Sequence, residues 1–205
     1  MKSNLNSDKL YKFIKTENPS LYHILTKENV VGEDNLKSEF RISVGDKGEQ
    51  QLKSKLLDES SGLISKLTDY HFEIRENSTP LYSGWCSFES FSSEFDLHLI
   101  SIEDNYFLIS NTSYEDVHME LFDDLEDCLY SCSCFLSNHL DYIQLELSNY
   151  KENKEYYDDS ESNGYGMSLE IEWNFPLPDY LFEKEIISKE RLSEIQTIEE
   201  EIDSF

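Results

Sequence analysis

The sequence predicts an α+β fold in which an antiparallel sheet of about five strands packs with helices. Apolar residues recur at helical spacing in the first third of the chain and near its C-terminal end. Between these parts, several segments alternate apolar and polar residues with the period of two that is typical of a half-buried strand. The chain has 205 residues, 38% of them apolar, with 13 Tyr and 12 Phe, which suffices for a sizeable hydrophobic core. We therefore expect a helical N-terminal third, a sheet and a C-terminal helix.

Residues 1–68 are predicted to form a near-neutral helical region. The segment SDKLYKFIKT, residues 7–16, has a helical pattern that ends before Pro19, because proline disfavours the helical conformation of the preceding residue. Asn18 is a suitable N-cap for a second helix, and a third helical pattern covers Gly48 to Leu67. Residues 69–205 are predicted to form a strongly acidic α+β region. No long linker separates the two regions, so we expect one compact domain overall.

Five segments after residue 69 have the alternating pattern of strands. They are residues 70–76, 94–102, 106–110, 141–150 and 167–175. A turn at residues 103–105 is expected to join the second and third of these, which indicates a hairpin or meander. In the last two segments the apolar positions are predicted to face inward and the acidic positions outward, and the outward positions include Glu170 and Glu172.

The segment after Ser113 is predicted to form an amphipathic helix that leads into the strand at 141–150. Its buried stripe is expected to hold Val117, Leu121, Leu125, Leu129, Cys132 and Leu136. The opposite face would carry five acids one or two turns apart, with about 6 Å per turn along the axis: Asp116, Glu120, Asp123, Asp124 and Asp127. This segment contains no Lys or Arg, and like-charge neighbours each cost about a few tenths of a kcal/mol. A basic partner would relieve that repulsion.

The chain ends in another predicted helix. Ser188 is expected to be its N-cap, and the inward positions are Leu192, Ile195, Ile198 and Ile202. The outward positions are mostly Glu and Asp. This helix is expected either to dock on the core or to pair with another copy of the chain.

The net charge of −26 is concentrated in one part of the chain. Residues 1–80 carry 12 Lys or Arg and 13 Asp or Glu, whereas residues 81–205 carry 5 and 30. An anionic protein is repelled by anionic lipid and by nucleic-acid phosphates, so we expect no membrane binding and no direct nucleic-acid binding. Adaptation to high salt would be expected to spread acids over the whole surface. A charged face that merely keeps the protein in solution is the other simple explanation.

Signatures of catalysis are absent from the sequence. It contains no G-x-x-x-x-G-K-[ST], G-x-G-x-x-G, G-x-S-x-G or H-E-x-x-H motif. Cys128, Cys132 and Cys134 do not have zinc-site spacing, and the first two are expected in the core, although a metal site with His118 or His139 stays an alternative. Glu170 and Glu172 would suit Mg²⁺, but their region lacks the Lys that binds substrate phosphate. We expect a protein that is not an enzyme and uses no cofactor or metal.

The remaining hypothesis is a non-catalytic acidic inhibitor that mimics nucleic-acid phosphates and blocks the basic groove of a nucleic-acid-binding protein. A phage-encoded anti-CRISPR or anti-restriction protein is an example, and the lack of alanine indicates AT-rich coding. The expected partner-binding residues lie on the helix face, on the polar loop at 151–166 and on the last strand. They are Asp116, Glu120, Asp123, Asp124, Asp127, Tyr156, Tyr157, Asp158, Asp159, Glu161, Glu170 and Glu172.

Two alternatives stay open. One is an immunity protein that neutralises a basic nuclease toxin, which uses the same electrostatics. The other is an oligomeric scaffold whose acidic surface is only solubilising. The N-terminus has no apolar signal region, and no run reaches the roughly 18 apolar residues of a membrane span. We therefore expect the protein in the cytoplasm of the producing bacterium or of a phage-infected host.

Overall fold

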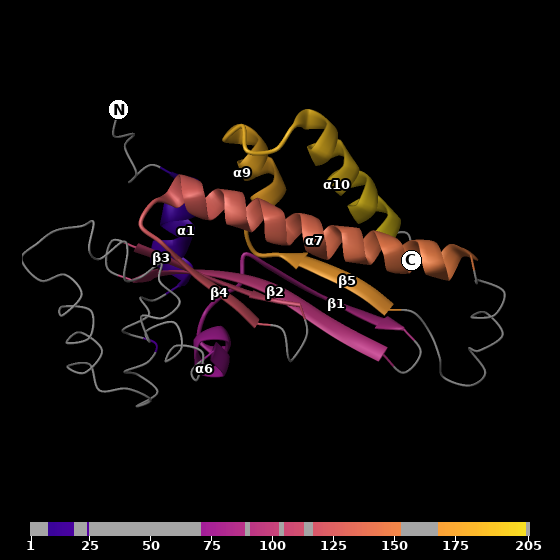
Figure 1. The fold of residues 1–205 in the computed structure, drawn as a ribbon, viewed down its shortest axis with the longest axis horizontal. Coiled ribbons are helices and arrows are strands. Elements are labelled where there is room, and N and C mark those ends of the chain that lie inside the picture. The colour runs from indigo at the N-terminus through magenta and orange to yellow at the C-terminus, as the bar shows by residue number, and fades with distance from the viewer. Residues whose placement is uncertain are drawn as a thin grey trace, which may run out of the picture. The chain divides into compact units, whose positions relative to one another are not determined.

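The computed structural model describes residues 8–18, 24, 71–88, 91–102, 105–112, 117–152 and 168–203. Figure 1 shows the elements that these ranges form. In chain order they are α1 (Lys9–Glu17), α6 (His71–Glu76), β1 (Tyr82–Phe88), β2 (Phe91–Ile102), β3 (Asn105–Asn111), β4 (Val117–Phe122), α7 (Leu125–Glu152), β5 (Ser168–Trp173), α9 (Leu177–Glu183) and α10 (Lys189–Asp203). Among the described residues, none of the helices has the length and apolar character that crossing a bilayer requires.

The five strands form one antiparallel sheet in the order β4-β3-β2-β1-β5. β5 pairs with β1 although three strands and α7 separate them in the sequence. The predicted α+β class, the sheet of five strands, the N-terminal helix and the C-terminal helix are confirmed.

The chain divides into two compact units, each assembled from several segments. One comprises Met1–Pro80, His98–Ile109 and His118–Cys128, and the other comprises Leu81–Leu97, Ser110–Val117 and Leu129–Phe205. The predicted division into residues 1–68 and 69–205 stays a prediction.

In the first unit, α1 begins and ends at polar side chains. Asp8 caps the helix, since its Oδ1 accepts from the backbone N–H of Leu10 at 2.9 Å and from that of Tyr11 at 3.4 Å. Asn18 ends it, and its buried amide donates to the carbonyls of Thr79 and Leu99 at 3.0 and 2.9 Å. The predicted end of this helix before Pro19 is thus confirmed. The helices predicted after Pro19 and at residues 48–67 lie outside the described residues, apart from Ile24.

The strand predicted at residues 70–76 is wrong, because this segment forms the short helix α6. Ile74 is its buried residue, and one turn of helix satisfies the same apolar pattern that suggested a strand. Polar side chains just after α6 donate hydrogen bonds to backbone carbonyls at the end of this helix. Asn77 Nδ2 donates to Glu73 O at 3.0 Å, and Ser78 Oγ donates to Ile74 O at 2.7 Å.

The helix predicted from Ser113 and the strand predicted at 141–150 are also wrong. Val117–Phe122 is the strand β4, and α7 begins only at Leu125 and continues without interruption to Glu152. Ile143 and Leu147 are both buried on α7, whereas Leu145 between them is 57% exposed. The apolar positions of 141–150 therefore continue the helical stripe of the preceding residues, which the local alternation concealed.

In the second unit, β1 is a strand that the sequence pattern does not indicate, because Ser83, Gly84 and Ser87 interrupt its apolar residues. Gly84 is required by close packing. A Cβ at this position would overlap the ring of Phe95 on β2 and lie 2.5 Å from the carbonyl oxygen of Glu170 on β5. The aromatic ring thus covers the glycine across the strands.

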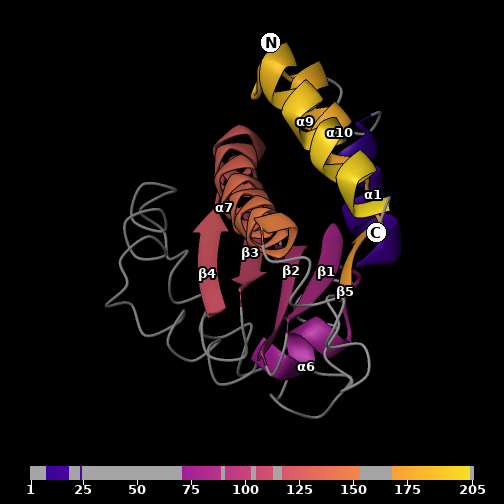
Figure 2. The ribbon, with the colours of Figure 1, turned by 90° about the vertical axis from the view of Figure 1, so that its right-hand side faces the viewer.

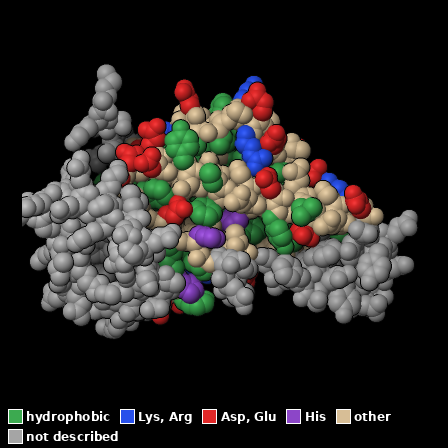
Figure 3. All heavy atoms as spheres, in the orientation of Figure 1, with side chains coloured by type: hydrophobic (Ala, Val, Ile, Leu, Met, Phe, Trp, Pro, Cys, Tyr) green, Lys and Arg blue, Asp and Glu red, His purple; other side chains and the backbone are tan. Residues whose placement is uncertain are grey.

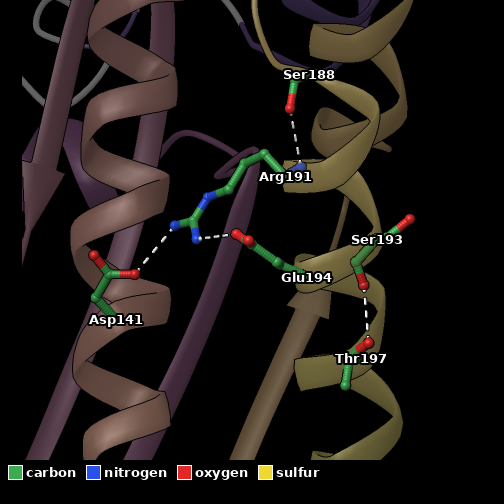
Figure 4. A network of polar contacts seen from close by, with 6 residues as sticks. All are labelled: Asp141, Ser188, Arg191, Ser193, Glu194 and Thr197. Carbon is green, nitrogen blue, oxygen red and sulfur yellow. Dashed lines mark hydrogen bonds and ion pairs between the residues drawn. The ribbon is translucent and has the colours of Figure 1, made fainter.

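The C-terminal helix α10 docks on its own chain. Ser188 is its N-cap as predicted, since its Oγ accepts from the backbone N–H of Arg191 at 3.2 Å. The buried positions are those predicted, except that Leu192 is half-buried: Ile195, Ile198 and Ile202. The guanidinium of Arg191 donates to Asp141 on α7 at 3.1 Å and to Glu194 at 3.0 Å (Figure 4). Figure 2 shows α9 and α10 together, beside α7.

Candidate partner-binding surface

The register of three neighbouring strands places four acids around one tryptophan. On β1, Trp85 pairs with Glu94 of β2 and Glu170 of β5. Two residues earlier on β1, Ser83 pairs with Asp96 and Glu172. Paired residues share a face of a sheet, and so do residues two apart on one strand. The six side chains therefore lie on one face, which we call the Trp85 face: Ser83, Trp85, Glu94, Asp96, Glu170 and Glu172.

The opposite face of the same strands packs against α7. The hydroxyl of Tyr82 and Nδ1 of His139 on α7 form a buried hydrogen bond of 2.7 Å. The ring of Phe95 lies 5.2 Å from that of His139 and 6.4 Å from that of Tyr82, measured between centroids. Because Tyr82 and Phe95 point toward α7, the residues that alternate with them on the Trp85 face point away from it.

The Trp85 face is partly open to solvent. The side chain of Trp85 is 36% exposed, and Glu94, Glu170 and Glu172 are exposed. Asp96 is only 7% exposed, and the side-chain amide of Asn111 on β3 donates to it at 3.5 Å. No hydrogen bond or ion pair to Glu170 or Glu172 is found within the described part of the chain.

A shallow cavity of about 250 Å³ lies on this face. It is lined by all six residues of the Trp85 face, together with Gly84 and Phe95. Residues two apart on a strand are separated by roughly 6.7 Å, and neighbouring strands by roughly 4.8 Å. Two unit charges about 7 Å apart repel by about 0.6 kcal/mol in water, and by more where water is excluded. The cavity therefore offers a site of negative potential with an aromatic wall.

Of the predicted site residues, the structure brings Glu170 and Glu172 together on the Trp85 face. Sequence reasoning missed Trp85, Glu94 and Asp96. Glu94 and Asp96 belong to a strand that was predicted, and their alternation with Phe95 and Leu97 was a usable signal. Trp85 had no such signal, because β1 itself is not apparent from the sequence.

The predicted acidic stripe on a helix face does not exist. Glu120 lies half-buried on β4, where one carboxylate oxygen is buried without a hydrogen-bond partner. Asp123 and Asp124 are exposed in the turn before α7, and Asp127 lies in its first turn. Asp116 lies outside the described residues, as do the predicted loop residues Tyr156, Tyr157, Asp158, Asp159 and Glu161.

The acids at the start of α7 have a local structural role. Asp124 Oδ1 accepts from the backbone N–H of Glu126 at 2.7 Å, so it caps the helix. Glu126 and Asp127 in the first turn are stabilised by the positive end of the helix dipole. We call Asp123, Asp124, Glu126 and Asp127 the α7-start acids. The repulsion expected for this part of the chain is thus offset by backbone N–H groups.

Figure 3 shows the side on which α7 and α10 lie. Its carboxylates are scattered among apolar side chains, and Lys and Arg lie beside some of them. Two such pairs hold α10 to α7: Arg191 with Asp141 at 3.1 Å, and Lys151 with Glu201 at 2.9 Å. Asp141 and Glu201 on this side therefore each have a cation of the same chain within ion-pair distance.

Three of the cysteines and two of the described histidines, His98 and His139, are buried. Cys86, Cys128 and Cys132 are buried free thiols, and Cys134 is exposed. Burial, with a smaller contribution from the charge of Glu146, raises the pKa of Cys86 to about 11, so this thiol stays protonated and unreactive at neutral pH. Burial lowers the pKa of His139 to about 4, with partial opposition from the charge of Asp96. Within the described ranges, no group of three or more His, Cys, Asp or Glu is placed to hold a metal ion.

Comparisons of the chain with protein-family models, with curated proteins and with solved structures find no match. The site therefore has to be interpreted from its own geometry.

Proposed function

We propose that this protein is a non-catalytic acidic inhibitor that covers the nucleic-acid-binding groove of a basic protein by presenting carboxylates in place of phosphates. The sheet register carries the proposal. It fixes Glu94, Glu170 and Glu172 on one face of three adjacent strands, within a region of the chain that holds 30 acids and 5 bases.

Arg and Lys side chains that bind phosphates also bind carboxylates, and Arg does so through two parallel hydrogen bonds. Carboxylates on a paired sheet are held in position before binding, so little conformational entropy is lost when the partner arrives. The net charge of −26 would also steer a basic partner toward the protein and raise the association rate.

The Trp85 face replaces the helix stripe as the surface that supports this function. The α7-start acids have a structural explanation, and Asp141 and Glu201 have cations from the same chain. Among the described residues, Glu170 and Glu172 have neither a capping role nor an ion pair with a cation. Among the partner classes, we propose a nuclease or a CRISPR or restriction effector, because these proteins present a basic groove that nucleic acid must enter for them to act.

The experiment is affinity capture from a low-GC bacterial lysate, with and without nuclease treatment, at low and moderate salt. We expect capture of a basic nucleic-acid-binding protein that salt releases and that added DNA or RNA displaces. The captured protein is then purified, and its binding to nucleic acid is measured by mobility shift at increasing concentrations of the acidic protein.

The matched variants decide whether the Trp85 face is responsible. Glu170→Gln with Glu172→Gln removes two charges from this face, and Glu152→Gln with Glu200→Gln removes two exposed charges from α7 and α10. We expect the first pair to weaken competition with nucleic acid at least about tenfold, as losing two charged hydrogen bonds predicts, and the second to leave it unchanged. Equal competition by both double variants, or simultaneous binding of the captured protein to nucleic acid and to this protein, would contradict the proposal.

A further inference from the structure

We propose that the cavity beside Trp85 receives one arginine side chain of the basic partner. This inference rests on the proposed function and specifies the contact at its centre. The observation behind it is that the indole of Trp85 lies beside the carboxylates of Glu94 and Glu170 on the neighbouring strands. All three line a cavity that is large enough for one side chain.

The position of Trp85 differs from what a solubilising surface requires. Such a surface needs charges and few exposed large aromatic side chains. Trp85 lies on a strand between two others, is 36% exposed, and has Glu94 on one neighbouring strand and Glu170 on the other. Among aromatic side chains, tryptophan has the most favourable interaction with a cation above its ring. The indole and the carboxylates therefore favour the same kind of ligand by two separate interactions.

The size of the cavity limits the ligand. Pockets for drug-sized ligands and cofactors are usually about 300–1,000 Å³, and this one is about 250 Å³ and shallow. It therefore suits one side chain better than a nucleotide or a cofactor. The indole of Trp85 is the apolar part of the lining, against which the methylene groups of a long basic side chain can pack.

The lining also favours an organic cation over a metal ion. None of its residues is basic, and four of them are acids. In the described part of the chain, these acids do not form a group able to hold a metal ion. Arginine fits better than lysine, because its planar guanidinium stacks on an indole, binds a carboxylate through two hydrogen bonds and is more weakly hydrated than an ammonium group.

The test uses the full chain, labelled with ¹⁵N, and follows its two indole N–H signals during titration with blocked arginine, whose termini are acetylated and amidated. Trp85→Phe assigns the Trp85 signal, and Trp173, which packs on Tyr82 on the opposite face, is the internal reference. Blocked citrulline has the same length without the charge, and blocked lysine has the charge without the planar group.

We expect arginine to shift the Trp85 signal saturably while the Trp173 signal stays in place. Citrulline should give no saturable shift, and lysine should bind several-fold more weakly. Glu170→Gln should weaken the arginine response, whereas Glu200→Gln on α10 should not. Three outcomes would contradict the arginine pocket. They are an equal response to citrulline, a non-saturable response to arginine, and an equal shift of both indole signals.

The captured partner separates this inference from the proposed function. Trp85→Leu should weaken its binding roughly 2- to 30-fold, the range that a cation–π contact spans. Trp85→Phe keeps an aromatic ring, so its affinity for the partner should lie between those of the wild type and of Trp85→Leu. Such a graded loss of affinity is not what misfolding of the variants would produce. If both Trp85 variants bind the partner as tightly as the wild type does, while Glu170→Gln with Glu172→Gln binds it more weakly, the proposed phosphate mimicry is supported and the arginine pocket is wrong. If the double variant also binds fully, the proposed function of this face fails as well.

Discussion

The backbone stabilises negative charge more strongly around the α7-start acids than around the acids of the Trp85 face. At the start of α7, unpaired N–H groups and the helix dipole stabilise carboxylates, and Asp124 is hydrogen-bonded to one such group. On β5, Glu170 and Glu172 project from a strand, whose peptide dipoles alternate and leave only a small net field. Charge density along the sequence is highest near the first group. The backbone therefore stabilises the first group, whereas it contributes little at Glu170 and Glu172.

The largest expected effect comes from overpacking β1, the strand that carries Trp85 between β2 and β5. Gly84→Val would force the ring of Phe95 aside and separate β1 from the backbone of Glu170. We expect a loss of about 3 kcal/mol in the free energy of unfolding, at the upper end of the range for overpacking. Urea denaturation measures it.

Ser83→Ala is the matched control for Gly84→Val, because it changes the neighbouring residue on the other face of β1. It should leave the urea midpoint nearly unchanged. An unchanged midpoint for Gly84→Val itself would show that Phe95 can move without cost, and Gly84 would then not be needed to bring these strands together.

The sequence allowed part of this fold to be predicted, wherever one period dominated a segment. β5 was found because apolar and polar residues alternate along its whole length, and its burial alternates accordingly. α10 was found because Ser188 and three isoleucines mark its start and its buried stripe. At 117–122 and 141–150 the apolar residues fit both periods, so local pattern could not decide between strand and helix. Packing against the rest of the chain determines which structure forms. Residues 117–122 are the strand β4, and residues 141–150 belong to α7.

The site was harder to predict than the fold, because it depends on pairing between distant segments. Glu170 and Glu172 were identified from the alternation of β5 alone. Their juxtaposition with Trp85 and Glu94 requires β1 to lie between β2 and β5, and nothing local in β1 specifies that position. The acidic density near α7 was the stronger signal in the sequence, but capping side chains and first-turn acids account for it.

Acidification tests the opposite face of the same strands, where the buried His139 of α7 packs on Tyr82 and Phe95 and where protonation of its imidazole opposes folding. Burial lowers the pKa of His139 to about 4, against about 6.5 in an unfolded chain. Its contribution is therefore fully present above about pH 6.5, is lost as the pH falls toward about 4, and changes no further below that value. The full loss amounts to about 3 kcal/mol.

His139→Gln isolates this contribution, since glutamine can keep a hydrogen bond to Tyr82 but does not titrate. Urea denaturation of both proteins between pH 7 and pH 4 should show the wild type losing more stability than the variant as the pH falls. Parallel pH profiles would mean that His139 is protonated in the folded protein as readily as in the unfolded chain.

Removing charge from each acidic group tests the comparison directly. Asp124→Ala removes the cap of α7 and should lower the free energy of unfolding by about 1 kcal/mol. Glu170→Gln with Glu172→Gln removes only repulsion and should leave stability within about 0.5 kcal/mol, slightly raised at low salt. Thermal unfolding at two salt concentrations distinguishes these outcomes. A large loss in the Gln double variant would mean that these glutamates serve the fold.

A small effect is also expected for acids that already have a cation of the same chain. Arg191 is the partner of Asp141 and Glu194, whose side chains are 64% and 60% exposed, so solvent screens both ion pairs. Arg191→Gln should therefore cost no more than about 1 kcal/mol and should lose most of its effect in 1 M salt. Lys151→Gln is the matched control, since it removes the other bridge between α7 and α10 and should behave alike. If Arg191→Gln instead released α10, then the buried Ile195, Ile198 and Ile202 would not suffice to hold this helix. Asp141 on α7 would then have to be regarded as a residue that holds α10 in place, and the α7–α10 side would depend on its ion pair as the Trp85 face depends on strand pairing.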